Sequence, residues 1–353
     1  MRLGLNLGYW GGDQASASDA LALALAAERL GYAVVWAAEA YGSDAVSVLG
    51  YLAARTQTID LGSAVLQIPG RSAALTAMTA ATLDALSGGR FRLGLGVSGP
   101  QVSEGWHGVP FGKPLARTRE YVDVVRLALS GRPVAYQGAH LVLPLPEGPG
   151  KALKLTTGPA RAGLPVYLAA VGPHNVELAG EVADGWLAMF FAPDQAADLL
   201  GHLDAGLARA GRGRADFDIA VTVPLVVADD PVEAADAVRD QVALYVGGMG
   251  SRTQNFYYTA ALRMGYETAA AAVQERYLAR DRKGAAAAVP YGLIDSTSLL
   301  GDRMRLAERM TAYAQAGVTT LSVSLPAASQ TLDQRLHALR TAAEALDLSG
   351  ATA

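Results

Sequence analysis

Three side chains of this chain stand where they could move protons. Glu39 directly follows the apolar run 33–38, so we expect it at the end of a buried strand, where a partly desolvated carboxyl group can hold a proton near neutral pH. Glu104 and His107 are three residues apart and could share one helical turn. The sequence leaves open that Glu39 is a structural hydrogen-bond acceptor and that the other two form a surface pair.

Other familiar catalytic patterns are absent. The five histidines are scattered without metal-ligand spacing, and the chain has no cysteine, so we expect no metal site and no thiol nucleophile. The sequence contains neither a GxSxG elbow nor a phosphate-binding Walker loop. Gly94 and Gly96 resemble the start of a dinucleotide fingerprint, but Pro100 follows where that motif needs backbone donors, so we reject the match.

A turn in the middle of the chain could bind an anion. The apolar run 165–171 leads through Gly172 directly into a helix, with Pro173 at its first position. Backbone amides at a helix N-terminus attract phosphate and carboxylate groups. Ordinary turn chemistry without a ligand is the alternative.

The pattern of apolar runs and alanine-rich stretches predicts parallel strands joined by crossover helices. A chain of 353 residues suits one barrel domain of roughly 250 residues enlarged by insertions. We therefore expect a single (β/α)8 TIM-barrel domain over 1–353, with insertions after strands 4 and 7. The expected strands are 3–8, 33–38, 59–66, 91–97, 165–171, 185–190, 217–227 and 319–325.

Two segments interrupt this alternation. Residues 133–164 are rich in proline and glycine and predict a hairpin-bearing loop. Residues 245–300 form a longer insertion after the seventh strand, where loops of a barrel border the ligand site, so this segment could form a lid. A packing module or a contact between protein copies is the alternative.

Composition restricts the partners of the protein. The net charge is −4 and no dense basic run occurs, which argues against nucleic-acid binding. No apolar stretch reaches the roughly 18–20 residues that span a bilayer, and the N-terminus lacks the pattern of a signal peptide. We expect a cytoplasmic homodimer that acts on a small-molecule substrate, with no membrane partner.

Several segments together resemble the luciferase-like monooxygenase superfamily, and more closely its coenzyme F420-dependent oxidoreductases from actinobacteria. The resemblance covers nearly the whole chain. It rests on AVLQIPGR, SGGRFRLGLGVSGPQVSEGW, VGPHNVELAGEVADGW and AYAQAGVTTLSVSL.

The resemblance implies a barrel that binds a deazaflavin, or FMN as the alternative, at its C-terminal face. It places a bulge with a non-prolyl cis peptide at Ala64–Val65, which would support one face of the ring. Gln67 matches a residue that contacts the ring edge, and Gly99 matches a glycine that lets the backbone approach the cofactor. The implied phosphate cradle is formed by Ala170, Val171, Gly172, Pro173 and His174.

This chain departs from the family at two positions. Luciferases and sugar-phosphate-oxidising F420 dehydrogenases have a histidine directly after the acid that matches Glu39, where this chain has Ala40. The dehydrogenases have a glutamate after the glycine that matches Gly99, where this chain has Pro100. Both usual proton handlers are missing, which favours reduction of an activated double bond over alcohol oxidation. Glu39, Glu104 and His107 are the nearby substitutes.

We expect cationic side chains for the anionic cofactor tail and an aromatic roof over the substrate. The candidates for the tail are Arg71, Lys113 and Arg117, and those for the roof are residues 249–258 and Tyr291. An FMNH2-dependent monooxygenase and a non-catalytic flavin-binding protein remain as alternatives, because the fold alone does not separate them.

Overall fold

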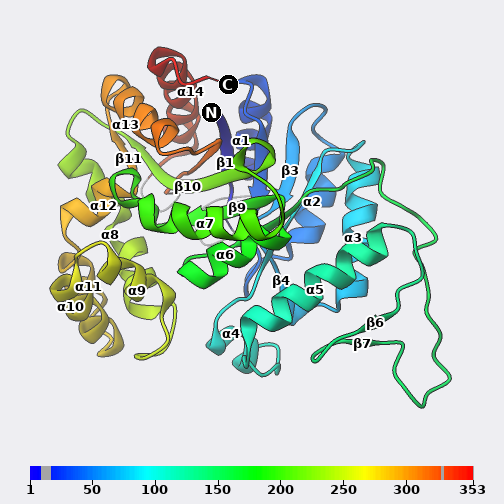
Figure 1. Cartoon of the computed structure of the whole chain (residues 1–353). Helices are drawn as coiled ribbons and strands as arrows, with labels where there is room; N and C mark the ends of the chain where they lie inside the picture. The colour runs from blue at the N-terminus through cyan, green and yellow to red at the C-terminus, as the bar shows by residue number, and fades with distance from the viewer. Residues whose placement is uncertain (9–16, 327–329, 353) are drawn as a thin grey trace.

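Parallel strands close into a barrel in the computed structural model, which describes residues 1–8, 17–326 and 330–352 (Figure 1). The last strand pairs with the first, in the register Arg2 opposite Thr320. The expected (β/α)8 fold and its eight strand positions are confirmed. In order around the barrel the strands are β1 (Arg2–Asn6), β2 (Val34–Ala37), β3 (Asp60–Ser63), β5 (Phe91–Gly96), β8 (Val166–Ala169), β9 (Gly185–Met189), β10 (Asp218–Val227) and β12 (Thr320–Ser324).

These strands form because their side chains are apolar on both faces. Every residue of β2 and β5 is buried, as expected for parallel strands covered by helices. Inside the barrel, Trp36 packs edge-on against Tyr167 with ring centroids 5.4 Å apart, and its indole donates to the Ser322 hydroxyl. The surrounding helices are α1 (Ala17–Arg29), α2 (Ala45–Ala53), α3 (Ala73–Leu86), α5 (Pro114–Leu129), α6 (Pro173–Val182), α7 (Ala197–Arg209), α13 (Arg303–Gln315) and α14 (Leu332–Ser349).

The expected strand 59–66 is divided by a bulge. It consists of β3 and the two-residue β4 (Leu66–Gln67), separated by a cis peptide bond between Ala64 and Val65, where the resemblance predicts it. The neighbouring strand accommodates the bulge with glycines. A Cβ at Gly94 would lie 1.9 Å from the Ser63 carbonyl oxygen, and one at Gly96 would lie 2.6 Å from Val65. The GLG motif therefore serves close backbone packing.

The first insertion follows β5. It contains α4 (Pro100–Gly105) before the barrel helix α5 and, after α5, a hairpin of β6 (Tyr136–Gln137) and β7 (Val142–Leu143), which the composition of 133–164 predicts. The buried Glu120 of α5 accepts hydrogen bonds of 2.8–2.9 Å from the amides of Ala139, His140 and Leu141. This carboxylate fastens the hairpin turn to α5.

The second insertion follows β10 and has an apolar core of its own. This core includes residues of α8, so it begins earlier in the chain than the expected segment 245–300. Figure 1 shows both insertions toward the end of the barrel away from the chain termini. The elements are α8 (Pro231–Gly248), α9 (Phe256–Arg263), α10 (Glu267–Leu278), α11 (Arg282–Ala287), α12 (Tyr291–Ser296) and β11 (Leu299–Gly301), and β11 pairs with β10.

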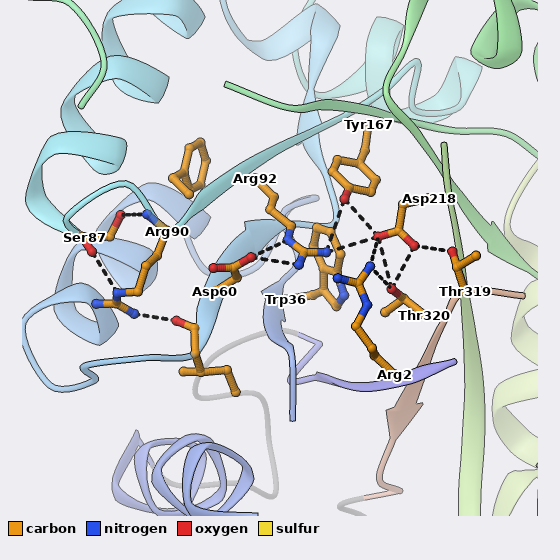
Figure 2. Close-up of polar contacts among 12 residues, drawn as sticks. Arg2, Trp36, Asp60, Ser87, Arg90, Arg92, Tyr167, Asp218, Thr319 and Thr320 are labelled. Carbon is orange, nitrogen blue, oxygen red and sulfur yellow. Dashed lines mark hydrogen bonds and ion pairs between the residues drawn. The ribbon is translucent and has the colours of Figure 1, made fainter. Parts of the chain in front are cut away.

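A buried polar network closes the opposite end of the barrel (Figure 2). Arg92 lies between Asp60, at 2.7 Å, and Asp218, at 3.1 Å. Asp218 also accepts from the hydroxyls of Tyr167 and Thr320, at 2.9 and 2.8 Å. Each of these residues is the first or second of its strand, so the network seals the N-terminal end and leaves the C-terminal end for a ligand site.

Short connections complete the described chain. Three 3-10 helices are η1 (Ile68–Gly70), η2 (Pro193–Gln195) and η3 (Arg214–Asp216). The two ends of the chain meet where the Met1 amino group donates to the Ala351 carbonyl at 2.7 Å. Among the described helices, none has the length and apolar character needed to cross a membrane.

Candidate active site

The C-terminal mouth of the barrel has an apolar floor. Ala64, Val65 and Ala169 are partly exposed and pack on the interior cluster that contains Trp36 and Tyr167. They lie at the ends of β3 and β8. A planar apolar ring system can therefore rest here without burying an unpaired polar group.

Gln67 joins two loops of the mouth. Its amide nitrogen donates to the Ala40 carbonyl at 2.6 Å, and its amide oxygen accepts from the Ser98 hydroxyl at 2.8 Å. The side chain is buried, so its polar atoms serve the loops after β2 and β5. Gly99 follows as the N-cap of α4, with nothing closer than 3.9 Å to a Cβ built on it, so the backbone is accessible there.

Glu39 is held in an ion pair. Its carboxylate lies 2.9 Å from the Arg71 guanidinium and accepts from the Ala45 amide at 3.3 Å. Arg71 also contacts Asp44 at 3.0 Å. Burial opposes the positive charge, but the bonds and charges of both acids outweigh it and raise the pKa of Arg71 above its usual value. Arg71 is therefore engaged within the protein, which weakens its case as a contact for a cofactor tail.

Glu104 and His107 are not brought together. Glu104 is exposed and accepts from the Phe111 amide at 3.0 Å, which closes its own loop. Helix α4 ends at Gly105, so His107 lies beyond it, with its ring against Gly70. His107 Nε2 is buried and has no hydrogen-bond partner within the described chain. Of the two, only His107 has a buried polar atom without a partner among the described residues.

The turn after β8 has the geometry that its sequence predicts. Gly172 is the N-cap of the ten-residue α6, Pro173 is its first residue, and a Cβ built on Gly172 would have no atom within 4 Å. The Val171 carbonyl accepts a hydrogen bond of 2.6 Å from Arg263 of α9. The Arg263 guanidinium therefore lies near the positive N-terminal end of α6, where no side chain covers the Gly172 backbone.

The other two residues of the expected cradle face elsewhere. Ala170 is buried, and its carbonyl accepts from the Trp186 indole at 2.8 Å. His174 is exposed, and its ring packs edge-on against His202 of α7 with centroids 6.4 Å apart. The accessible part of the turn is thus centred on Gly172.

Aromatic rings from the second insertion reach the segments around the mouth. Phe256 lies 6.4 Å from Phe111, which belongs to the loop between α4 and α5. Tyr257 lies 5.4 Å from Phe190, at the end of β9. Tyr291 instead packs against the core of the insertion. Helix α9 therefore supplies the part of the expected roof that contacts the barrel.

Sequence reasoning missed several polar and aromatic groups at the mouth. Asn6, the last residue of β1, donates to Thr222 of β10 at 3.4 Å. A polar residue that ends an apolar strand is the signal that could have found Asn6. Arg263 and Phe111 carry no such signal, because their positions depend on how the insertions fold back.

Comparison with known proteins identifies the family. Residues 4–320 match the luciferase-like monooxygenase family, and the chain belongs to it. A Mycobacterium tuberculosis protein that bears the name coenzyme F420-dependent oxidoreductase is 44% identical over 94% of this chain and 97% of its own length. A 5,10-methylenetetrahydromethanopterin reductase of Archaeoglobus fulgidus is 33% identical over 85% of this chain and 87% of its own length. Within the family, the chain is an oxidoreductase.

Solved structures share the fold. The coenzyme F420-dependent tetrahydromethanopterin reductase of Methanopyrus kandleri superposes with a TM-score of 0.81 over 97% of each chain, at 24% identity. An F420-dependent secondary alcohol dehydrogenase, solved with an F420–acetone adduct, superposes with a TM-score of 0.77 over 96% of this chain and 97% of its own, at 19% identity.

Proposed function

We propose that this chain is an F420-dependent oxidoreductase that transfers a hydride between the deazaflavin C5 and a small organic substrate. One observation carries the proposal: the C-terminal mouth combines an apolar floor at Ala64–Val65 with an open, cationic helix start at Gly172. The Mycobacterium tuberculosis relative that is named for F420 supports this choice of cofactor. When bound, F420 supplies the hydride chemistry.

The residues of the mouth fit such a group. The floor formed by Ala64, Val65 and Ala169 offers one apolar face to a ring and excludes water from it. The amides of Gly172 and His174, together with Arg263, would hold a phosphate group by charge-assisted hydrogen bonds. These residues bind and orient the cofactor.

Glu39 acts in this proposal by positioning. Its carboxylate ties the loop after β2 to Arg71, which follows η1, and to the start of α2. Oε2 of this carboxylate is therefore engaged within the protein. We assign proton exchange with the substrate to His107, whose buried Nε2 has no hydrogen-bond partner among the described residues.

Reduction is the favoured direction. Ala40 and Pro100 stand where the related dehydrogenases carry their proton-accepting side chains, so an alcohol would find no base at either position. A reductase needs only one proton donor and a dry site. We therefore propose an activated C=C, C=N or C=O bond as the reacting group, with α9 roofing the substrate.

Parallel titrations of the purified protein with F420 and FMN, followed by fluorescence, test the choice of cofactor. We expect F420 to bind more tightly than FMN, and reduced F420 to be oxidised when an activated alkene is added. Micromolar binding of FMN without binding of F420 would overturn the proposal in favour of a flavin monooxygenase. Binding of F420 without turnover of any alkene, imine or ketone would leave a non-catalytic cofactor-binding protein.

A further inference from the structure

A cavity of about 560 Å³ lies beside the barrel mouth. Its walls are η1 and the start of α3, the first turns of α5, and the turn between β6 and β7. In Figure 1 this is the region where α3 and α5 approach the hairpin. The volume is typical of sites that hold a small organic molecule.

The lining of this cavity is apolar with a cationic edge. Ile68, Val109, Phe111 and Leu141 form much of the apolar wall. Positive charge comes from arginine side chains, and the described lining contains no aspartate or glutamate. Arg71 already pairs with two carboxylates. Arg117 donates to the Pro110 carbonyl, a neutral partner that leaves its charge uncompensated. The lining thus suits an apolar body that ends in an anion.

An orphaned hydroxyl group marks the polar end. Thr118 is only 4% exposed and lines the cavity, yet its Oγ1 has no hydrogen-bond partner within the described residues. Buried hydroxyl groups nearly always have a partner. Oγ1 is closed to solvent in this structure, so a change of the Thr118 rotamer would bring this unpaired donor to a ligand in the cavity. Lys113 is the N-cap of α5, and its side chain makes no hydrogen bond to the first amides of that helix. The uncapped helix N-terminus therefore adds positive potential near Thr118.

The cavity wall is fixed in place. The bonds from Glu120 to the amides of Ala139, His140 and Leu141 hold the hairpin turn, which carries the outer wall, against α5. The outer wall is therefore held in one position without a ligand, which lowers the entropic cost of binding one.

We propose that this cavity is a second small-molecule site, which binds an organic anion with an apolar body, such as a medium-chain carboxylate. The carboxylate accepts from Thr118 and pairs with Arg117, and the chain lies along the apolar wall. We place this site beside the cofactor site, because Val65, Gln67 and Gly172 are not among its lining residues. Arg117, which the sequence offered for the cofactor tail, serves the second site in this proposal.

Isothermal titration calorimetry of the full-length protein with sodium decanoate, below its micelle-forming concentration, tests this site. We expect one decanoate per chain. Thr118→Val should weaken binding severalfold, yet leave the melting temperature unchanged or raised, because it removes an unpaired hydroxyl group. Arg117→Gln should weaken binding on the order of tenfold.

A third variant fills the cavity with a bulky side chain and has a matched control. Ala74 is an exposed residue of α3 that lines the cavity, so Ala74→Trp should abolish decanoate binding. Its neighbour Leu75 is exposed and does not line the cavity, so Leu75→Trp should bind normally.

Three results would overturn the proposal. The first is no heat of binding at millimolar decanoate, and the second is equal binding by all four variants. The third is loss of F420 affinity in Ala74→Trp or displacement of decanoate by F420, which would make the cavity part of the cofactor site. Failure of F420 to bind at all, with decanoate still bound, would reject only the proposed function.

Discussion

Glu39 is a candidate site residue that also makes structural contacts. Its carboxylate bonds Arg71 and the Ala45 amide, and it lies at the mouth, with its side chain only 12% exposed. We expect Glu39→Gln to lower F420 affinity or turnover at least severalfold, because the loop after β2 loses its charged anchor. The melting temperature should change little, since the glutamine oxygen can still accept from the Ala45 amide.

A matched control for this change is Asp44→Asn. It removes the other carboxylate that contacts Arg71 but is half-exposed, and asparagine preserves the cap of α2. Its F420 affinity and turnover should stay near those of the unmodified protein. If Glu39→Gln left affinity and turnover intact while the melting temperature fell, Glu39 would be purely structural.

Backbone roles at the site could be predicted from the sequence, whereas side-chain partners could not. Pro173 at the first turn of α6 follows from local chemistry, and so does the exposed backbone at Gly172. The bond from Gln67 to Ala40 and the bond from Arg263 to Val171 join residues 27 and 92 positions apart. Such pairings depend on the closed barrel, which no local pattern encodes.

At the scale of elements, the hairpin depends on one carboxylate. Burial raises the pKa of Glu120, but the bonds from the amides of His140, Leu141 and Ala139 outweigh it and hold this pKa below the usual 4.5. A lowered folded-state pKa means that the stabilisation is complete above about pH 4.5 and is lost as the pH falls through the lower folded value.

We therefore expect the hairpin turn to open in acid before the barrel unfolds. Hydrogen exchange of the amides of 139–141 should be slow at neutral pH and should accelerate, after correction for the intrinsic rate, below about pH 4.5. Glu120→Gln should show fast exchange already at neutral pH, while the amides of α5 stay protected in both proteins. Equal protection of 139–141 in both proteins would contradict this role.

The insertions could be located from the sequence more readily than their packing. Proline and glycine mark the hairpin segment, and the long gap between strands marks the second insertion. The inclusion of α8 in the second core was not expected, because its apolar stripe also suits a helix packed on the barrel. An apolar stripe predicts that one face of a helix is buried, but it does not identify the element against which that face packs.

At the scale of the whole molecule, the buried polar network and the candidate cofactor site lie at opposite ends of the barrel. The network around Arg92 and Asp218 closes the N-terminal end, whereas the candidate cofactor residues lie at the C-terminal end. The strand pattern predicted the barrel because apolar runs alternate with helices along the whole chain. It did not predict this network, since its charged residues begin different strands and meet only on closure.

Removing Arg92 should therefore destabilise the fold without altering the mouth. Arg92→Met leaves Asp60 and Asp218 without their buried cation and should lower the free energy of unfolding by about 3–5 kcal/mol, measured by urea denaturation. Arg303→Met breaks an exposed pair with Glu344 and should cost less than about 1 kcal/mol. A variant of Arg92 that is as stable as the unmodified protein would show that the network is dispensable.

The homodimer expected from the sequence stays a prediction, and so does the role of the second insertion as a lid. Neither is needed for the central claim, which concerns the cofactor. That claim places the phosphate of F420 at the start of α6, where Gly172 leaves the backbone open.

The affinity of Gly172→Asp for F420, measured by fluorescence titration, tests this claim most directly. The new carboxylate would compete for the same amides and repel the phosphate, so affinity should fall severalfold or more. Aspartate is a good helix N-cap, so the variant should remain folded. Gly213→Asp, at the open N-cap of η3, is the matched control and should bind F420 normally. Unchanged affinity in Gly172→Asp would contradict the account and place the phosphate elsewhere.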